Sequence, residues 1–263
     1  MLVSGNSIFV GNTEIFKVFQ GEDLVWSKSS TEPDYLTFTI LSAGTITTYH
    51  QGEVARYMDA QYSKNGERWQ NMPAFGINVE VGDVVRLRGQ GIFADGSSRY
   101  FGHVSHGFWY NSFAGSAVFD ISGNLLSMEY GSGFTGQTET AMPDAGLGYI
   151  FSGSNVHSAE NLILPQSQSG TSTNILMGLF KGCGSLRISP VISNATFNLG
   201  CASMFEYCSS LDYIKCLAKS EGTLYATYFT LGVAATGTFV KAANATWYRG
   251  GHGIPDNWTI IEE

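Results

Sequence analysis

Three stretches of this chain can be laid over one another, and they set its fold class. They are YIFSGSNVHSAENLILP at residues 149–165, LFKGCGSLRISPVI at 179–192 and MFEYCSSLDYIKCL at 204–217. Each contains a phenylalanine, then a serine or cysteine three residues later, and a leucine, valine or cysteine eleven residues later. A period in the twenties with Leu and Cys at fixed offsets predicts a leucine-rich-type solenoid, in which each turn of chain buries its apolar side by stacking on the next.

The four cysteines of the chain, Cys183, Cys201, Cys208 and Cys216, all fall within this repeat region. None of them forms the Cys-x-x-Cys pair that is typical of zinc sites. Each occupies a repeat position that points into the solenoid, and free cysteine behaves as a small, usually buried hydrophobe. We therefore predict four reduced core residues that serve neither as metal ligands nor as nucleophiles.

The composition of the whole chain agrees with short strands joined by many turns. Of 263 residues, 43% are hydrophobic and 14% are charged, and 32 are glycine against 6 proline. We predict a mainly β fold with two or more modules. The net charge of −8, with no Lys/Arg cluster, argues against a nucleic-acid partner. No apolar run reaches the roughly 18 residues of a membrane span, and the first residues lack a secretory leader pattern, so we expect no membrane insertion.

Residues 1–28 predict three short strands, near 7–10, 14–19 and 24–27, separated by turn sequences. Strands of this size bury too little surface to be stable alone. They are either an edge sheet packed on the next domain of the same chain or an assembly anchor covered by another chain. The polar run at 29–33 is typical of a linker and favours the anchor. The predicted anchor residues are Phe16, Val18, Phe19, Leu24 and Trp26.

Residues 34–112 predict a small antiparallel β-sandwich, because alternating apolar and polar runs recur there between turn sequences. Asn65-Gly66 is the strongest hairpin signal, since both central residues of such a turn favour positive φ. Beyond this module we predict a β-hairpin junction and solenoid N-cap at 113–148, the solenoid at 149–236 and a C-terminal cap at 237–263.

The segment 89–112 is long, rich in glycine and aromatic. Long ordered loops of this kind are often binding loops, and exposed aromatic side chains are suited to stacking on sugars or to anchoring protein contacts. A different interpretation is that this loop seals the joint between the sandwich and the solenoid. The candidate ligand-binding residues are Tyr100, Phe101, Phe108, Trp109 and Tyr110.

No motif in the sequence specifies an enzyme, since neither a Gly-x-Ser-x-Gly element nor a Walker-type phosphate loop is present. His103 and His106 have ligand-like spacing, but a metal site would need further ligands, such as Asp95. Glycosidase chemistry needs two neighbouring carboxylates, and sequence spacing leaves open whether residues such as Asp120 and Glu129 converge. We predict no catalytic residues, no bound metal and no cofactor.

Several of these stretches resemble known proteins. The repeat, with FKGCGSL at 180–186 and FEYCSSLDYIKCL at 205–217, resembles the leucine-rich repeats of Bacteroidales surface proteins of the BspA-like class. The ending TGTFVK…GIPDNWTIIEE resembles the cap that closes such repeats, and YSKNGERW with VGDVVRLRG resembles the β-domain that often precedes them. The opening IFKVFQGEDLVWSK is similar to short openings of virion proteins of Bacteroidales-infecting tailed phages, including crAss-like phages.

Together the resemblances imply a non-enzymatic virion structural protein, either a tail or head appendage or a decoration protein. Assembly in the host cytoplasm needs no leader and agrees with four reduced thiols. The expected partners are other virion proteins of the capsid or tail and a host-surface glycan or protein, and we expect a homo-oligomer. The alternatives are a bacterial surface leucine-rich-repeat adhesin whose leader is missing from this sequence, and a depolymerase.

Overall fold

The computed structural model describes residues 33–51, 60–89, 103–104, 109–141, 146–168, 174–193, 200–220 and 226–263, together with the short strands of the first 27 residues. Strands dominate these residues, and the only helices among them are α1 (Ser127–Tyr130) and the 3-10 turn η1 (Gly131–Gly133). The prediction of a mainly β fold is confirmed. The chain divides into two compact units, Met1–Asp34 and Tyr35–Glu263.

The N-terminal unit contains five strands where the sequence predicted three. They are β1 (Leu2–Ser4), β2 (Ser7–Val10), β3 (Thr13–Ile15), β4 (Lys17–Gln20) and β5 (Asp23–Ser27). β1, β2 and β3 form one antiparallel sheet, and β4 pairs with β5 in a separate hairpin. The single strand predicted over residues 14–19 is thus divided between two sheets. The side chains of the predicted anchor residues lie outside the described residues.

The second unit, called the body below, is built on one ten-stranded sheet in the order β21-β20-β19-β18-β16-β14-β6-β11-β8-β9. The antiparallel half contains β6 (Leu36–Ser42), β8 (Ala60–Lys64), β9 (Gln70–Asn71), β11 (Val84–Gly89) and β14 (Val118–Asn124). The parallel half contains β16 (Val156–Ile163), β18 (Ile188–Ile192), β19 (Tyr213–Cys216), β20 (Thr238–Lys241) and β21 (Thr259–Glu262).

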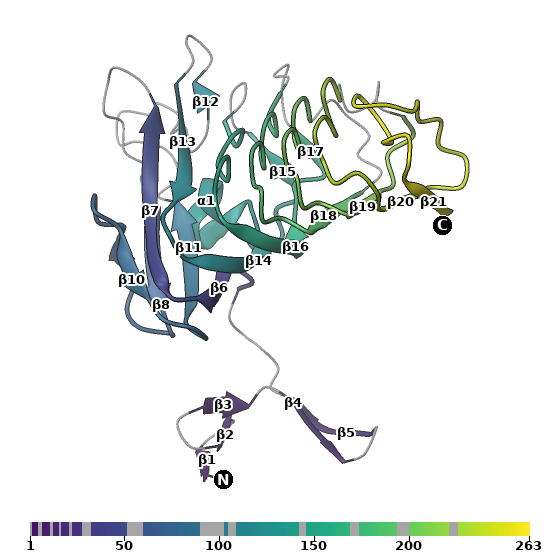
Figure 1. The fold of residues 1–263 in the computed structure, drawn as a ribbon. Helices are drawn as coiled ribbons and strands as arrows, with labels where there is room; N and C mark the ends of the chain where they lie inside the picture. Colours follow the sequence, from purple (N-terminus) through teal and green to yellow (C-terminus); the bar gives the residue numbers. More distant parts are fainter. Residues whose placement is uncertain are drawn as a thin grey trace. The chain divides into compact units, whose positions relative to one another are not determined.

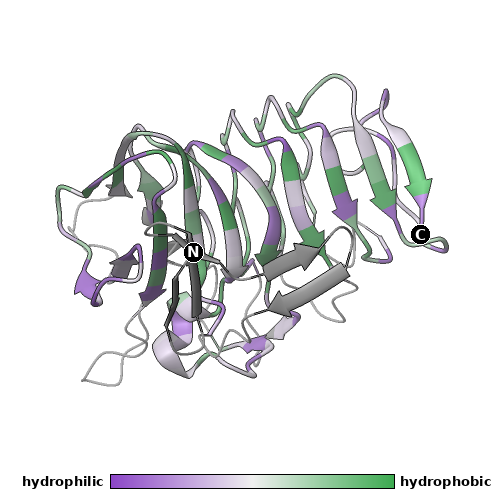
Figure 2. Cartoon of the chain, turned by 90° about the horizontal axis from the view of Figure 1, so that it is seen from below, coloured by the Kyte–Doolittle hydropathy of each residue, from purple (hydrophilic) through white to green (hydrophobic). Residues whose placement is uncertain are grey.

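Strand β14 joins the two halves, because it pairs antiparallel with β6 on one side and parallel with β16 on the other. Figure 1 shows the parallel strands side by side along one side of the body, with their connecting loops along the opposite side. Apolar and polar segments follow one another along these strands in Figure 2, since successive side chains of a strand point to opposite faces. The sheet therefore runs through the boundaries drawn from the sequence at residues 112–113 and 148–149.

A second, four-stranded antiparallel sheet in the order β10-β7-β13-β12 covers part of the first. Its strands are β7 (Gly44–Gln51), β10 (Ile77–Val79), β12 (His103–Val104) and β13 (Trp109–Ala114). The two sheets meet at Phe38 and Phe113, whose ring centroids are 5.0 Å apart in an edge-to-face contact. A two-stranded parallel pair, β15 (Glu139–Thr140) with β17 (Ser167–Gln168), completes the body.

A row of fully buried phenylalanines runs the length of the body. Ring centroids are 6.0 Å apart from Phe113 to Phe151, 5.4 Å from Phe151 to Phe180, 5.8 Å from Phe180 to Phe205 and 5.2 Å from Phe205 to Phe229. The first three contacts are stacked and the last is edge-to-face, geometries that add about 0.5–1.5 kcal/mol per pair beyond burial. We call these five residues the phenylalanine row. It makes one continuous core of the antiparallel and parallel halves.

Each phenylalanine of the row after Phe113 lies in a short turn, and each of these turns is hydrogen-bonded to the turn that follows it in the chain. These coil turns are residues 149–153, 178–182, 203–207 and 228–232. Alternate backbone N–H groups of one coil turn donate to carbonyl groups of the following coil, so that three bonds of 2.7–3.1 Å link each successive pair. The parallel strands form one backbone ladder and the coil turns form a second, so backbone polar groups on both sides of the core are satisfied.

Replacing Phe180 with alanine is expected to lower the free energy of unfolding by about 3–5 kcal/mol, because it leaves a ring-sized cavity between two stacked neighbours. Phe75, which is 96% exposed, provides the matched control, and its replacement with alanine should change stability by less than about 0.5 kcal/mol. Denaturant titration of both variants measures the difference. Equal effects of the two substitutions would contradict the role given to the phenylalanine row.

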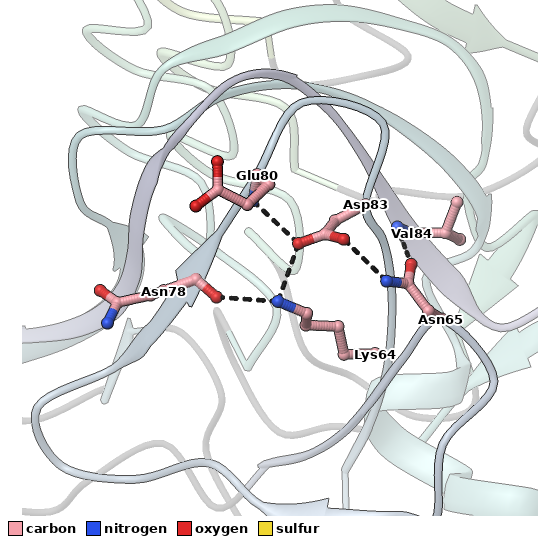
Figure 3. Close-up of polar contacts among 6 residues, drawn as sticks. All are labelled: Lys64, Asn65, Asn78, Glu80, Asp83 and Val84. Carbon is pink, nitrogen blue, oxygen red and sulfur yellow. Dashed lines mark hydrogen bonds and ion pairs between the residues drawn. The ribbon is translucent and has the colours of Figure 1, made fainter.

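The Asn65-Gly66 turn forms as predicted, with φ of 52° and 80° at its two residues. Its Asn65 side chain accepts from the Val84 N–H at 2.8 Å and donates to an Asp83 oxygen at 2.7 Å (Figure 3). Asp83 also accepts from the Glu80 N–H and pairs with Lys64, both at 2.8 Å. Burial alone would raise the pKa of the Asp83 carboxyl, but these hydrogen bonds and the lysine lower it to about 2.

Because the pKa of Asp83 is lowered, the free energy of unfolding of the body is expected to decrease at low pH. The ionised carboxylate contributes its full stabilisation above the ordinary pKa of 3.8, and this contribution is lost as the pH falls toward about 2. The free energy of unfolding of the native chain should therefore fall more steeply between these pH values than that of an Asp83→Asn variant. Parallel pH-dependent slopes for the two proteins would show that this carboxylate is not the titrating group.

Candidate functional site

The ligand-binding residues predicted from the sequence fall largely outside the described residues. This holds for Tyr100, Phe101 and Phe108. Trp109 and Tyr110 begin β13, where the backbone pairs Trp109 with Val104 and Tyr110 with His103 of β12, but their side chains are not described. The predicted binding loop therefore stays a prediction.

Asp120 and Glu129, the acidic residues named above for catalysis, contact different partners. The two oxygens of Glu129, which is buried, accept from the Thr140 hydroxyl at 2.6 Å and from the Ala141 N–H at 2.7 Å. Asp120 lies instead 2.9 Å from Nδ1 of His157. Burial raises the pKa of Glu129 against the opposing effect of its hydrogen bonds. Within the described ranges, no three His, Cys, Asp or Glu side chains are grouped so that they could hold a metal ion.

The coil turns and the turn after them carry exposed tyrosines. Tyr207 is 56% exposed, Tyr228 48% and Tyr248 77%, whereas most other aromatic side chains of the parallel half are buried. We define the tyrosine edge as the side chains that line the coil turns and their C-terminal neighbour. They are Tyr149, Lys181, Glu206, Tyr207, Tyr228 and His252.

Three tyrosines of this edge occupy backbone positions that favour glycine. Every coil turn begins and ends in the left-handed region of φ, and four of the eight positions are glycine. Tyr149, Tyr207 and Tyr228 adopt φ of 60°, 62° and 55° at three of the others. A left-handed residue with a β-carbon costs roughly 1–2 kcal/mol relative to the right-handed form. Strain of this kind is found disproportionately at functional sites.

Two of the tyrosine rings lie against glycines of the following coil. A β-carbon added to Gly178 would come within 2.4 Å of the Tyr149 ring, and one added to Gly232 within 2.8 Å of the Tyr207 ring. The absence of a side chain at these glycines lets each ring lie directly over the neighbouring backbone. The tyrosines are thus held by the coil stack, and Tyr207 still presents more than half of its surface to solvent.

An ion pair lies near Tyr149 and Tyr207. Lys181 Nζ lies 2.6 Å from Oε2 of Glu206, whose side chain is almost fully buried. Burial alone would lower the pKa of Lys181, but the pairing with Glu206 and the neighbouring Tyr149 and Tyr207 hydroxyls raise it. Lys181 is therefore a charged group at neutral pH, already balanced by Glu206.

His252 supports the last tyrosine from the C-terminal side. The Tyr228 N–H donates to Nδ1 of His252 at 3.0 Å, so the neutral imidazole carries its proton on Nε2. The two rings are 4.8 Å apart and tilted by 36°. The tyrosine edge is therefore a series of fixed aromatic rings interleaved with hydrogen-bonding groups. Such a surface can stack on planar or ring-shaped ligands.

Sequence reasoning missed the tyrosine edge, although the repeat contains its signal. In the alignment of the three stretches, the positions two before and two after the phenylalanine hold Tyr149 and Gly153, then two glycines, then Ser203 and Tyr207. Alternation of glycine with tyrosine at fixed repeat positions indicates a left-handed backbone with an occasional exposed ring. The fourth coil was not aligned, so Tyr228 was not considered.

All four cysteines are free and buried, as predicted. The thiols of Cys183 and Cys208 donate to the Phe151 and Phe180 carbonyl oxygens at 2.9 and 3.0 Å. Burial raises the pKa of Cys183 and of Cys216 to about 12, and it also raises the pKa values of the other two thiols. The thiolate is the reactive form, so these residues are inert in the folded protein.

A search of protein-family models, of curated proteins and of solved structures finds no match to this chain. No helix in the described part of the chain is long and apolar enough to cross a membrane.

Thiol titration with a colorimetric disulfide reagent at pH 8 is expected to detect no reactive cysteine in the folded chain. Four thiols should react once the chain is unfolded in guanidinium, because burial and the raised pKa values are then lost. A thiol that reacts rapidly under native conditions would contradict the burial of that cysteine.

Proposed function

We propose that this chain is a non-enzymatic structural protein of a phage particle, a tail or head appendage or a decoration protein. Its N-terminal strands dock onto other virion proteins of the capsid or tail. The body, a small antiparallel β-sandwich followed by a leucine-rich-repeat-type solenoid with a C-terminal cap, is displayed for attachment to a host-surface glycan or protein. The protein assembles in the host cytoplasm as a homo-oligomer and functions as a component of the virion.

The division of the chain into two unequal units is the observation that carries this proposal. Five strands of three to five residues, in two separate small sheets, make up the first unit. Sheets of this size do not bury enough surface to be stable alone. The body has its own continuous core. A short, strand-rich unit that needs a partner beside a self-contained body is what an anchored display protein requires.

The tyrosine edge supports the attachment half of the proposal. Exposed aromatic rings held in a fixed geometry are suited to recognition, because little side-chain entropy is lost on binding. The acidic net charge of −8 directs the search for a partner away from nucleic acid.

The likeness of the repeat to Bacteroidales surface proteins favours a second candidate, a bacterial surface adhesin. The two candidates differ in where the protein resides. Mass spectrometry of purified phage particles and of washed cell envelopes distinguishes them. Presence in particles supports the virion protein, whereas presence in envelopes of uninfected cells together with absence from particles refutes it.

Deleting residues 1–28 is expected to leave the body folded with an unchanged thermal midpoint, because the body has its own continuous core. Incorporation of the truncated chain into particles should fall at least tenfold relative to the full chain when both are expressed during infection. Quantitative mass spectrometry of the particles, with circular dichroism of the purified body, measures both effects. Loss of the folded body on truncation would show that the N-terminal strands belong to its core.

A further inference from the structure

We propose that the tyrosine edge binds an extended neutral polysaccharide, with sugar rings that stack on Tyr207, at the end of the third coil turn, and on Tyr228, at the start of the fourth. This inference rests on the attachment role proposed above and specifies its ligand and its site. The argument uses the backbone of the coil turns, the placement of the rings, and the charges around them.

The exposed tyrosines occupy strained backbone positions, which indicates that the rings have a role. Glycine fills four of the eight left-handed positions without strain, and tyrosine at three of the other four adds strain that glycine would avoid. Packing over a neighbouring glycine compensates for Tyr149 and Tyr207. Tyr228 instead contacts the imidazole of His252 and remains 48% exposed. The coil turns thus hold tyrosines at left-handed positions while leaving ring surface in solvent.

The tyrosines are spread over several coil turns, which favours a long ligand over a small one. Tyr149, Tyr207 and Tyr228 belong to the first, third and fourth coil turns. Neighbouring strands of a parallel ladder are about 4.8 Å apart, so the edge extends over about 14 Å along the body. The remaining left-handed positions hold four glycines and Ser203, so no other large side chain stands at them. An extended oligomer can lie across several coils and contact more than one ring.

The charges of the protein favour a neutral extended ligand over an anionic one. Lys181 is balanced by Glu206 at 2.6 Å and offers no unpaired positive charge to an anionic chain. The net charge of −8 disfavours the approach of polyanions in general. The hydroxyl groups of a neutral glycan can instead exchange hydrogen bonds with the Nε2–H of His252 and with the tyrosine hydroxyls.

A protein partner fits this edge less well. Protein–protein contacts centre on a contiguous, desolvated patch surrounded by a polar rim. The rings of the tyrosine edge are separated instead by glycine backbone and by a charged pair. Isolated flat rings between polar groups suit a ligand whose own rings present one apolar face and many hydroxyl groups.

The test uses the full chain and two variants, Tyr207→Gly and Tyr228→Gly. Glycine adopts the left-handed region freely, so both variants should keep the coil turns, which circular dichroism and thermal unfolding check. Tyr49→Ala is the matched control, because Tyr49 is 50% exposed and lies on β7, outside the coil turns. The probes are neutral hexaoses of glucose, mannose and N-acetylglucosamine, a galacturonate hexamer, and the neutral polysaccharide fraction of Bacteroidales envelopes with and without periodate oxidation.

Isothermal titration calorimetry should detect binding of at least one neutral probe, and periodate treatment should abolish binding of the envelope fraction. Each glycine variant should weaken the affinity about tenfold, the loss of one stacking contact, and Tyr49→Ala should leave it unchanged. Three results overturn the proposal. They are no binding to any neutral probe, preference for the galacturonate hexamer, and equal affinity of the glycine variants and the native chain.

The outcome is separable from the anchoring claim. Particle incorporation depends on residues 1–28 and is measured without any glycan. Tyrosine-dependent binding of defined hexaoses with no binding to the envelope fraction would support the site and refute the host-surface role. Binding to envelopes that protease destroys and periodate spares would identify a protein partner and refute the glycan.

Discussion

The stacking of one buried phenylalanine on the next is the contact on which the body depends. A parallel coil cannot cover its own apolar side, so its stability comes from its neighbours. The phenylalanine row supplies this cover in the middle, and two backbone ladders, of strands and of coil turns, hold the coils in register on either side. Ion pairs such as Arg187–Asp212 link adjacent coils at the surface, where each contributes far less than the core.

The phenylalanine row also connects the antiparallel half of the body to the parallel half. Phe38 and Phe113 belong to the facing antiparallel sheets, and Phe113 stacks on Phe151 of the first coil. Strand β14 makes the matching connection in the backbone. Because the two halves share one core and one ten-stranded sheet, their unfolding is expected to be coupled. It can therefore hold the tyrosine edge in a fixed position relative to the antiparallel half.

Local signals in the sequence predicted local features well. Asn65-Gly66 gave the turn because its chemistry depends on two residues, and the repeat gave Phe151, Phe180 and Phe205 together with the buried cysteines. Phe229 was missed, since its coil places it one residue earlier against the left-handed pair than the other coils do. The parallel pairing of β14 with β16 was also missed, because no local pattern records which distant strand a segment joins. The tyrosine edge depends on residues with positive φ. A sequence indicates positive φ mainly through glycine, so the left-handed positions that hold tyrosine gave no such signal by themselves.

The left-handed positions of the coil turns have an evolutionary consequence. Gly153 and Gly182 are left-handed as well, and a β-carbon added at either would meet no atom closer than 3.9 Å, so the backbone has room for a side chain there while the core and both ladders stay as they are. A lineage can therefore alter what the surface recognises through single codon changes that leave folding intact. Sequence variation in exposed side chains would then be concentrated at the left-handed positions of the coil turns. Substitutions elsewhere in the coils would be limited by core packing.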